Sequence, residues 1–326
     1  MAPLLDVRGL EVTFPTRRKP VRALQGVDLR LQPGEVLGLV GESGSGKSVM
    51  ARAIMGLLAH PGHVSGGQIL FEGRDLVGLG PDEMRALRGN RMAMIFQDPM
   101  ATLNPVLRIE EQMAEALLAH DPRMPREAVR ARCLEVLRQV GIPAPEERLR
   151  GWPHEFSGGM RQRIIIATAL LNRPALILAD EATTALDVTI QAQILHEMRV
   201  LCEANGTALV WITHDLAVVS GIADHIAVMY AGRIVESGPA GQVLGDPRHP
   251  YTRGLLGSIP DNAQPGSALA QIPGLMPSPA DLPRGCAFRP RCDRAGAGCG
   301  DATPPETKAG DRVWRCLHPL NAEVPA

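Results

Sequence analysis

The fold is decided by the stretch Val36-Leu37-Gly38-Leu39-Val40-Gly41-Glu42-Ser43-Gly44-Ser45-Gly46-Lys47-Ser48. Its first five residues are apolar or glycine, a pattern typical of a short buried strand. The next eight match G-x-x-x-x-G-K-[ST] at every fixed position, and residues 49–58 after them have the spacing of a helix. A strand, a glycine-rich turn and a helix in this order predict a loop that binds the phosphates of a nucleotide.

The residue types in this loop fit that chemistry. Glycines allow backbone N–H groups to converge on phosphate oxygens, and the start of the following helix adds the positive end of its dipole. Lys47 is expected to reach the β- and γ-phosphates, and the Ser48 hydroxyl is expected to ligate Mg²⁺. The candidate nucleotide-binding residues of the loop are Gly41, Ser43, Gly44, Ser45, Gly46, Lys47 and Ser48.

Four more apolar runs alternate with amphipathic stretches, which predicts an α/β domain built on a partly parallel sheet. These runs span residues 92–96, 175–179, 208–213 and 226–229. Gln97 follows the first run, Asp180-Glu181 the second and His214 the third. Because ligands bind at the carboxyl ends of strands in open α/β sheets, these side chains are expected to join Lys47 at one site. Asp180 would hold Mg²⁺, and Glu181 would polarise the attacking water.

A further segment reads Ser157-Gly158-Gly159-Met160-Arg161-Gln162 and leads into the apolar run 164–171. Ser157 is expected to cap the start of a helix, because a serine oxygen can accept a hydrogen bond from a backbone N–H of the first turn. The two glycine amides beside it predict a second cradle for an anion.

The domain organisation follows from changes of pattern along the chain. Residues 109–120 and 126–140 have helical spacing without strand signals, so a helical subdomain is expected over about 98–163. From residue 246 onward apolar periodicity is weak, and 13 of the 28 prolines lie in the last 81 residues. We therefore expect a nucleotide-binding domain over 1–245 and a small appended domain over 246–326.

Composition and charge exclude several classes of protein. Lys and Arg total 34 and Asp and Glu total 35, a net charge of −1 that argues against binding to a long nucleic acid. No apolar run approaches the ~20 residues of a membrane span. The first residues lack the pattern of a signal peptide, so the chain is expected to stay in the cytosol.

Four of the six cysteines lie within 31 residues near the end, at positions Cys286, Cys292, Cys299 and Cys316. In a reducing compartment this cluster favours a metal over disulfides. Four thiolates can close one Zn²⁺ site or one [4Fe–4S] cluster, and the gaps of 5, 6 and 16 residues do not choose between them. Cys133 and Cys202 lie on helix-like segments and are expected to be ordinary buried thiols.

The order and spacing of these motifs resemble the ATPase subunits of ABC transporters over about residues 4–245. The corresponding family motifs are Walker A (41–48), the Q-loop (Gln97), the signature (157–162), Walker B (Asp180-Glu181), the D-loop (Ala185-Leu186-Asp187) and the switch histidine (His214). The signature reads SGGMRQ where the family more commonly has SGGQ. The chain resembles one branch in particular, the dipeptide and oligopeptide importers, at residues 96–100, 103–105, 249–252, 285–286 and 290–292.

The resemblance implies an ATP-hydrolysing subunit that powers a peptide importer. Two such subunits would close head to tail around two ATP molecules, with Ser157, Gly158, Gly159 and Asp187 contributing to the nucleotide sites. Phe14 matches the aromatic residue that stacks on adenine, although a place in the core explains it as well. Gln97 would link Mg²⁺ to the helical subdomain, which would dock on the membrane subunits.

The resemblance also implies the assembly and its location. The partners would be a second ABC ATPase, related or identical, two transmembrane permease subunits and an extracytoplasmic substrate-binding protein, at the cytoplasmic face of the inner membrane. In this branch the C-terminal cysteines can hold a [4Fe–4S] cluster, which favours that cluster over zinc. Three alternatives stay open: another cargo such as nickel or glutathione, a soluble ABC ATPase acting on ribosomes or DNA, and a nucleotide switch that does not hydrolyse ATP.

Overall fold

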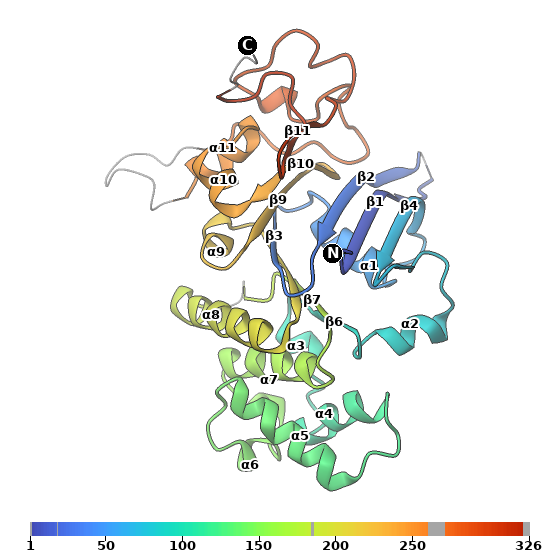
Figure 1. Cartoon of the computed structure of the whole chain (residues 1–326), viewed down its shortest axis with the longest axis vertical. Helices are drawn as coiled ribbons and strands as arrows, with labels where there is room; N and C mark the ends of the chain where they lie inside the picture. Colours follow the sequence, from blue (N-terminus) through green and yellow to red (C-terminus); the bar gives the residue numbers. More distant parts are fainter. Residues whose placement is uncertain (1, 18, 184–185, 260–270, 322–326) are drawn as a thin grey trace. The chain divides into compact units, whose positions relative to one another are not determined.

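The computed structural model describes residues 2–17, 19–183, 186–259 and 271–321 (Figure 1). Contacts between residues divide the chain into two units. The first comprises Met1–Leu31, Val36–Val77 and Thr213–Ala326, and the second comprises Gln32–Glu35 and Gly78–Ile212. No helix in the described residues is both long and apolar enough to cross a membrane.

An antiparallel sheet forms one part of the first unit, with the strand order β2-β1-β4-β5 (Figure 1). Its strands are β1 (Leu5–Phe14), β2 (Val21–Leu31), β4 (His63–Phe71) and β5 (Arg74–Asp75). Leu5 pairs with Leu31 on one side and with Phe71 on the other, and all three side chains are buried. Burial of this apolar row fixes the register, because a slip by one residue would turn the row to the solvent.

The first unit also contains the strand that precedes the phosphate loop. Strand β3 (Val36–Val40) is entirely buried and pairs in parallel with β9 (His225–Tyr230). Beyond β9 follow the antiparallel strands β10 (Arg233–Pro239), β12 (Arg312–Trp314) and β11 (Thr307–Ala309). The helical elements of this unit are α1 (Lys47–Ile54), α9 (Leu216–Ser220), α10 (Ala240–Gly245), α11 (Pro250–Gly257) and the 3-10 turn η3 (Arg289–Arg291).

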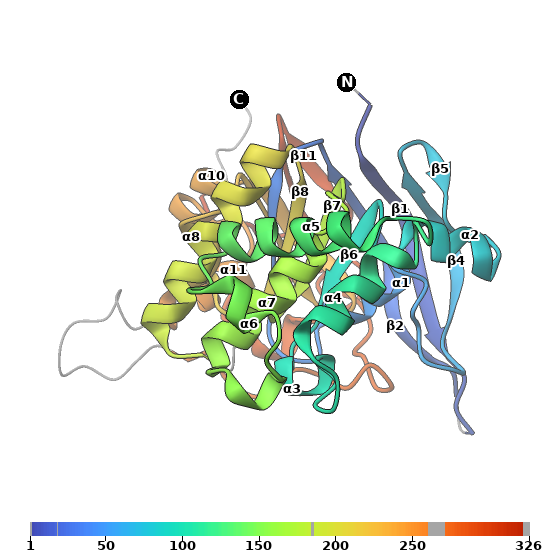
Figure 2. The same cartoon turned by 90° about the horizontal axis from the view of Figure 1, so that it is seen from below.

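The second unit places helices beside a parallel sheet with the order β8-β7-β6 (Figure 2). The strands are β6 (Met92–Ile95), β7 (Leu176–Asp180) and β8 (Ala208–Thr213), whose last residue belongs to the first unit. The helical elements are α2 (Pro81–Leu87), α3 (Pro99–Thr102), α4 (Ile109–Leu118), α5 (Arg126–Gln139), α6 (Pro145–Arg148), η1 (Pro153–Glu155), α7 (Gly158–Leu170) and α8 (Val188–Asn205). Helices α4, α5 and α7 pack on one another, and α6 adjoins α5.

The predicted strands and the predicted helices over 109–120 and 126–140 are confirmed to within one or two residues. The extent of the helical subdomain, about 98–163, stays a prediction. The helix after the phosphate loop differs from the expected range 49–58. It begins at Lys47, directly after the last loop glycine, and it ends at Ile54 because Gly56 turns the backbone into the left-handed region at φ 61°. The expected domain boundary at residue 245 is not tested by these observations and stays a prediction.

Candidate functional site

The phosphate loop, residues 41–48, joins β3 to α1 in a backbone conformation that requires glycine. Gly41 and Gly46 have φ angles of 154° and 112°, and side chains rarely accompany such backbone angles. A Cβ atom at Gly41 would also lie 2.2 Å from the carbonyl oxygen of Met229 in β9. These two glycines let the chain turn sharply between a buried strand and a helix whose first N–H groups face the loop.

Lys47 lies inside this loop. Its side chain is buried, and its ammonium donates to the carbonyl oxygens of Gly41 (2.6 Å) and Glu42 (3.0 Å). The hydroxyl of Ser45, also buried, lies 3.4 Å from the same ammonium. The loop therefore surrounds the Lys47 ammonium at the place where the sequence predicts that phosphates bind. Ser48 follows Lys47 in the first turn of α1.

The ends of β6 and β7 bring two of the predicted site residues together in the second unit. The Gln97 side-chain amide donates to a carboxylate oxygen of Glu181 at 2.9 Å. Glu181 has a left-handed φ of 49°, and its N–H donates to the carbonyl oxygen of Ile212 at 2.9 Å. Such a conformation in a residue other than glycine costs roughly 1–3 kcal/mol and is characteristic of functional sites. Asp180, the residue before it, is the buried last residue of β7.

The signature segment begins α7 as the sequence predicts. The Ser157 hydroxyl accepts a hydrogen bond from the N–H of Met160 at 3.3 Å, which caps the helix. Ser157 and Gly158 are exposed. A Cβ atom at Gly159 would approach Ile190 of α8 to 3.1 Å, so the absence of a side chain lets the starts of the two helices lie close together.

The remaining predicted residues lie at the ends of other elements. Asp187 is exposed and caps α8, because its carboxylate accepts the N–H of Ile190 at 3.0 Å. Ala185 of the expected D-loop lies outside the described residues. His214 is exposed directly after β8. Phe14 is half-buried at the end of β1, where its ring would meet a Cβ at Gly62 at 2.3 Å. This contact gives Phe14 a packing role, and its contact with adenine stays a prediction.

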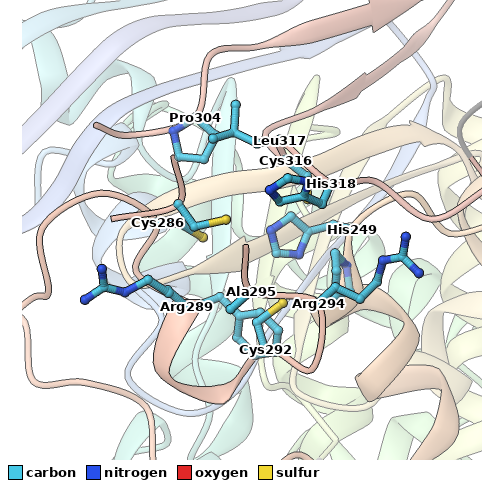
Figure 3. Close-up of a pocket in the computed structure, with 13 residues that line it drawn as sticks. His249, Cys286, Arg289, Cys292, Arg294, Ala295, Pro304, Cys316, Leu317 and His318 are labelled. Carbon is cyan, nitrogen blue, oxygen red and sulfur yellow. The ribbon is translucent and has the colours of Figure 1, made fainter. Parts of the chain in front are cut away.

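The four C-terminal cysteines line one small cavity of about 10 Å³ together with His249 and His318 (Figure 3). This volume holds roughly one water-sized sphere. Burial raises the pKa values of Cys286 and Cys292, and it raises that of Cys316 to about 11. Cys286, Cys292 and Cys316 therefore share a cavity and are held in their protonated form.

This arrangement does not confirm the expected metal centre. Among the residues that the structure describes, no three His, Cys, Asp or Glu side chains are grouped as a metal site. The cysteines line one cavity, as their clustering in the sequence predicts, and the metal that they would hold stays a prediction. Cys133 in α5 and Cys202 in α8 are buried thiols far from this group in sequence, as expected.

Residues 24–184 match the family model for ABC transporters, and residues 235–299 match the model for the C-terminal region of oligopeptide and dipeptide transporters. The oligopeptide transport ATP-binding protein OppD of Bacillus subtilis is 49% identical over 97% of this chain and 89% of that protein. This chain belongs to the ABC transporter ATP-binding family. It is therefore an ABC-type ATPase.

Another relative and a solved structure support the same family and fold. The dipeptide transport ATP-binding protein DppD of Haemophilus influenzae is 47% identical over 98% of this chain and 97% of that protein. A dimeric post-hydrolysis structure of the ATP-binding cassette MJ0796 with ADP and Pi superposes with a TM-score of 0.65 at 29% identity, covering 72% of the ATPase and 98% of that chain. The expected cassette fold is thus confirmed.

Sequence reasoning missed two residues that contact the phosphate loop. The hydroxyl of Tyr251 in α11 accepts the N–H of Glu42 at 2.8 Å, and the guanidinium of Arg291 in η3 donates to the Glu42 carboxylate at 2.9 Å. Both partners come from beyond residue 245, in the region with no recognisable nucleotide-binding motif. The signal for both was resemblance alone, because residues 249–252 and 290–292 resemble segments of the peptide importers.

Proposed function

We propose that this ATPase powers an importer for dipeptides and oligopeptides. The observation that carries the proposal is the match of residues 235–299 to the C-terminal region of oligopeptide and dipeptide transporters, because the cassette itself occurs in ABC proteins of many functions. The names of relatives that cover nearly the whole chain, an oligopeptide and a dipeptide transport ATP-binding protein, support the same cargo class.

In this proposal the phosphate loop binds the nucleotide. Lys47 exchanges its carbonyl contacts for the β- and γ-phosphates, and the loop N–H groups donate hydrogen bonds to the remaining phosphate oxygens. The bound phosphates are expected to contact Gly41, Ser43, Gly44, Ser45, Gly46, Lys47 and Ser48. Ser48 and Asp180 would hold Mg²⁺, with Gln97 beside them, and the ion would neutralise the charge that develops on the phosphates.

Glu181 acts as the general base of the hydrolysis. Its carboxylate takes up the proton of the attacking water as the water oxygen bonds to the γ-phosphorus. The bond from this phosphorus to the ADP oxygen breaks in the same step, and ADP and phosphate leave. The Gln97 amide holds one carboxylate oxygen at 2.9 Å and so fixes the direction of the other. His214, at the end of the neighbouring strand, is assigned to the γ-phosphate by the family motif. Phe14 is assigned to the adenine ring on the same basis.

A second ABC ATPase, identical or related, completes each nucleotide site. The exposed signature residues Ser157 and Gly158, the neighbouring Gly159 and the exposed Asp187 would face the nucleotide held by the partner. The dimeric state of the MJ0796 cassette supports this arrangement.

Two transmembrane permease subunits and an extracytoplasmic substrate-binding protein would complete the importer, and the ATPase would lie at the cytoplasmic face of the inner membrane. Residues 100–104, near the start of the helical subdomain, are the proposed contact with the permeases.

The cysteine cavity is included in the proposal as the site of a [4Fe–4S] cluster, with Zn²⁺ as the alternative. Its support is the donor set, because four thiols line one cavity and thiolates favour both metals. Their raised pKa values oppose metal binding, since a metal must displace the thiol protons. Iron, sulfide and zinc analysis of anaerobically purified protein tests this part, and a protein that contains none of them would remove the metal from the proposal.

The cargo is tested with the ATPase reconstituted in proteoliposomes with its permeases and substrate-binding protein. We expect ATP-dependent uptake of labelled dipeptides and oligopeptides, and no uptake with the Glu181→Gln variant. Uptake of nickel or glutathione without peptide uptake would contradict the proposed cargo but not the assignment of the chain as an ATPase. Purification of the ATPase with ribosomes or DNA-binding proteins in place of permeases would contradict the transport function itself.

A further inference from the structure

Glu42, the second residue of the phosphate loop, is held at three of its atoms. Its N–H donates to the Tyr251 hydroxyl at 2.8 Å, and its carboxylate accepts the Arg291 guanidinium at 2.9 Å. Its carbonyl oxygen accepts the Lys47 ammonium at 3.0 Å. The Tyr251 and Arg291 side chains are buried and the Glu42 side chain is 28% exposed, so these contacts lie largely within the protein. The C-terminal part of the chain therefore contacts the loop directly, through one hydrogen bond and one ion pair.

The contact with Tyr251 sets the orientation of one loop peptide. In a trans peptide the N–H and the C=O point in opposite directions. Because Tyr251 holds the N–H of Glu42, the carbonyl of Gly41 points the other way, and it accepts the Lys47 ammonium at 2.6 Å. Burial raises the pKa of Tyr251, so the hydroxyl stays neutral at physiological pH. Rotation of this peptide would displace the lysine that is assigned to the phosphates.

Arg291 neutralises a carboxylate beside the phosphate loop. One Glu42 oxygen accepts its guanidinium, and the other is buried without a hydrogen-bond partner among the described residues. Arg291 is itself fixed, because it donates to the carbonyl oxygen of Pro273 at 2.8 Å and lies 5.9 Å from the ring centre of Tyr230. Without this cation, Glu42 would present an uncompensated negative charge to an anionic ligand.

The same C-terminal region also reaches the middle of the loop. A Cβ atom at Gly44 would lie 3.3 Å from the methyl carbon of Met276. Arg291 precedes Cys292, and Phe288 before it lines the cysteine cavity. Contacts from three C-terminal segments therefore bear on the loop, in a region that otherwise carries none of the nucleotide-binding motifs.

We propose that Tyr251 and Arg291 are positioning residues of the ATP site, through which the C-terminal region tightens nucleotide binding. Tyr251 orients the peptide between residues 41 and 42, and Arg291 cancels the charge of Glu42. This inference rests on the proposed binding of phosphates by the loop, and it extends the functional site to the peptide-transporter region of the chain.

The test is the affinity of the full-length ATPase for MgATP in the variants Tyr251→Phe and Arg291→Gln. Each is expected to raise the Kd about tenfold, because each leaves a hydrogen-bonding group or a charge of the loop without its partner. The same rise is expected in KM, with kcat at saturating ATP within about twofold of the wild type, because both residues act on binding. Arg253→Gln is the matched control, since this residue lies on the same helix as Tyr251 and pairs with Asp293 without contacting the loop.

A rescue variant separates positioning from mere stability. In Glu42→Gln/Arg291→Gln the charge that Arg291 cancels is gone, so the Kd should return to within about threefold of the wild type. A role in folding alone would leave the double variant as weak as Arg291→Gln. Tyr251→Phe keeps the buried ring and loses one oxygen, so it carries the test if Arg291→Gln does not fold.

Wild-type affinity in both single variants, or no rescue in the double variant, would overturn the positioning role. These outcomes are distinct from a failure of the proposed function. A wild-type ATPase that binds MgATP tightly and supports no peptide uptake would contradict the cargo, whatever the variants do.

Discussion

The phosphate loop and the C-terminal region 271–321 belong to the same unit but are held in place by different interactions. The loop follows β3, whose five residues are all buried, and its shape depends on glycine conformations and backbone contacts. The C-terminal region has two three-residue strands and one 3-10 turn among its described residues. It is fixed by buried arginines paired with carboxylates, Arg291 with Glu42 and Arg312 with Glu236.

This difference predicts different consequences of substitution. Changes at the ends of the strands should affect nucleotide chemistry while the apolar core keeps the fold. Changes at the buried ion pairs should affect stability, because removal of one partner leaves a charge in an apolar surrounding.

The largest effect is expected at the end of β7. Glu181→Gln should lower kcat by about 10²–10⁴-fold, the usual contribution of a general base, because the amide cannot take up the proton of water. MgATP binding should be retained, since Gln97 and the phosphate loop are unchanged. Steady-state hydrolysis and nucleotide binding measure the two quantities. Unchanged turnover would show that another group acts as the base.

The next effect concerns the C-terminal ion pair. Arg312 donates to Glu236 at 3.0 Å, and the Glu236 side chain is 0% exposed. Arg312→Met should destabilise the first unit by about 3–5 kcal/mol, because the buried carboxylate loses its counter-charge. Urea unfolding measures this loss. Arg253→Met, which removes a half-exposed pair with Asp293, is the control and should cost less than about 1 kcal/mol. Equal losses in the two variants would remove the contrast between buried and exposed pairs.

Lys47 tests the phosphate loop. Lys47→Ala should raise the Kd for MgATP about 100-fold, since a charge-assisted contact is worth about 1.5–3 kcal/mol. The midpoint of thermal unfolding should change little, because the glycines and β3 still shape the loop. Lys19→Ala is the control, since this lysine lies on the surface and pairs with Asp281. Tight MgATP binding by Lys47→Ala would argue against the loop as the phosphate site.

The smallest effect is a pH dependence from His249. Burial lowers its pKa from 6.5 to about 3, and its Nδ1 accepts the N–H of Tyr251 at the start of α11. Below pH 6.5 this histidine binds a proton in the unfolded chain but not in the folded chain. The free energy of unfolding should therefore decrease as the pH is lowered from 6.5 to 3. At pH 5.5 the loss should be about 1.4 kcal/mol relative to neutral pH.

His249→Asn isolates this contribution. Asparagine can still cap the helix but does not titrate, so the part of the acid-dependent loss that comes from residue 249 should disappear from urea unfolding at pH 5.5 and 7.5. The same pH slope in the variant and in the wild type would assign the acid sensitivity to other groups.

The sequence predicted those features of the site that depend on where a strand ends or on residues close together in the chain. The meeting of Gln97 and Glu181 followed from the rule that parallel strands end at one edge of a sheet. The cap at Ser157 followed from one residue and its neighbours. The clustering of the four cysteines predicted that they lie together, and they line one cavity. A spacing in sequence does not fix the directions of four thiols, so the metal that they would hold stays a prediction.

The sequence by itself determined the phosphate loop, because a glycine at a left-handed position and a helix start act through the backbone within a few residues. Only the tertiary structure decided that residues near the C-terminal end of the chain form hydrogen bonds with this loop. Tyr251 and Arg291 lie 209 and 249 residues from Glu42, and no local pattern connects them. Their contacts exist because the packing of β9, α11 and η3 brings an aromatic hydroxyl and a guanidinium to one buried peptide and one carboxylate.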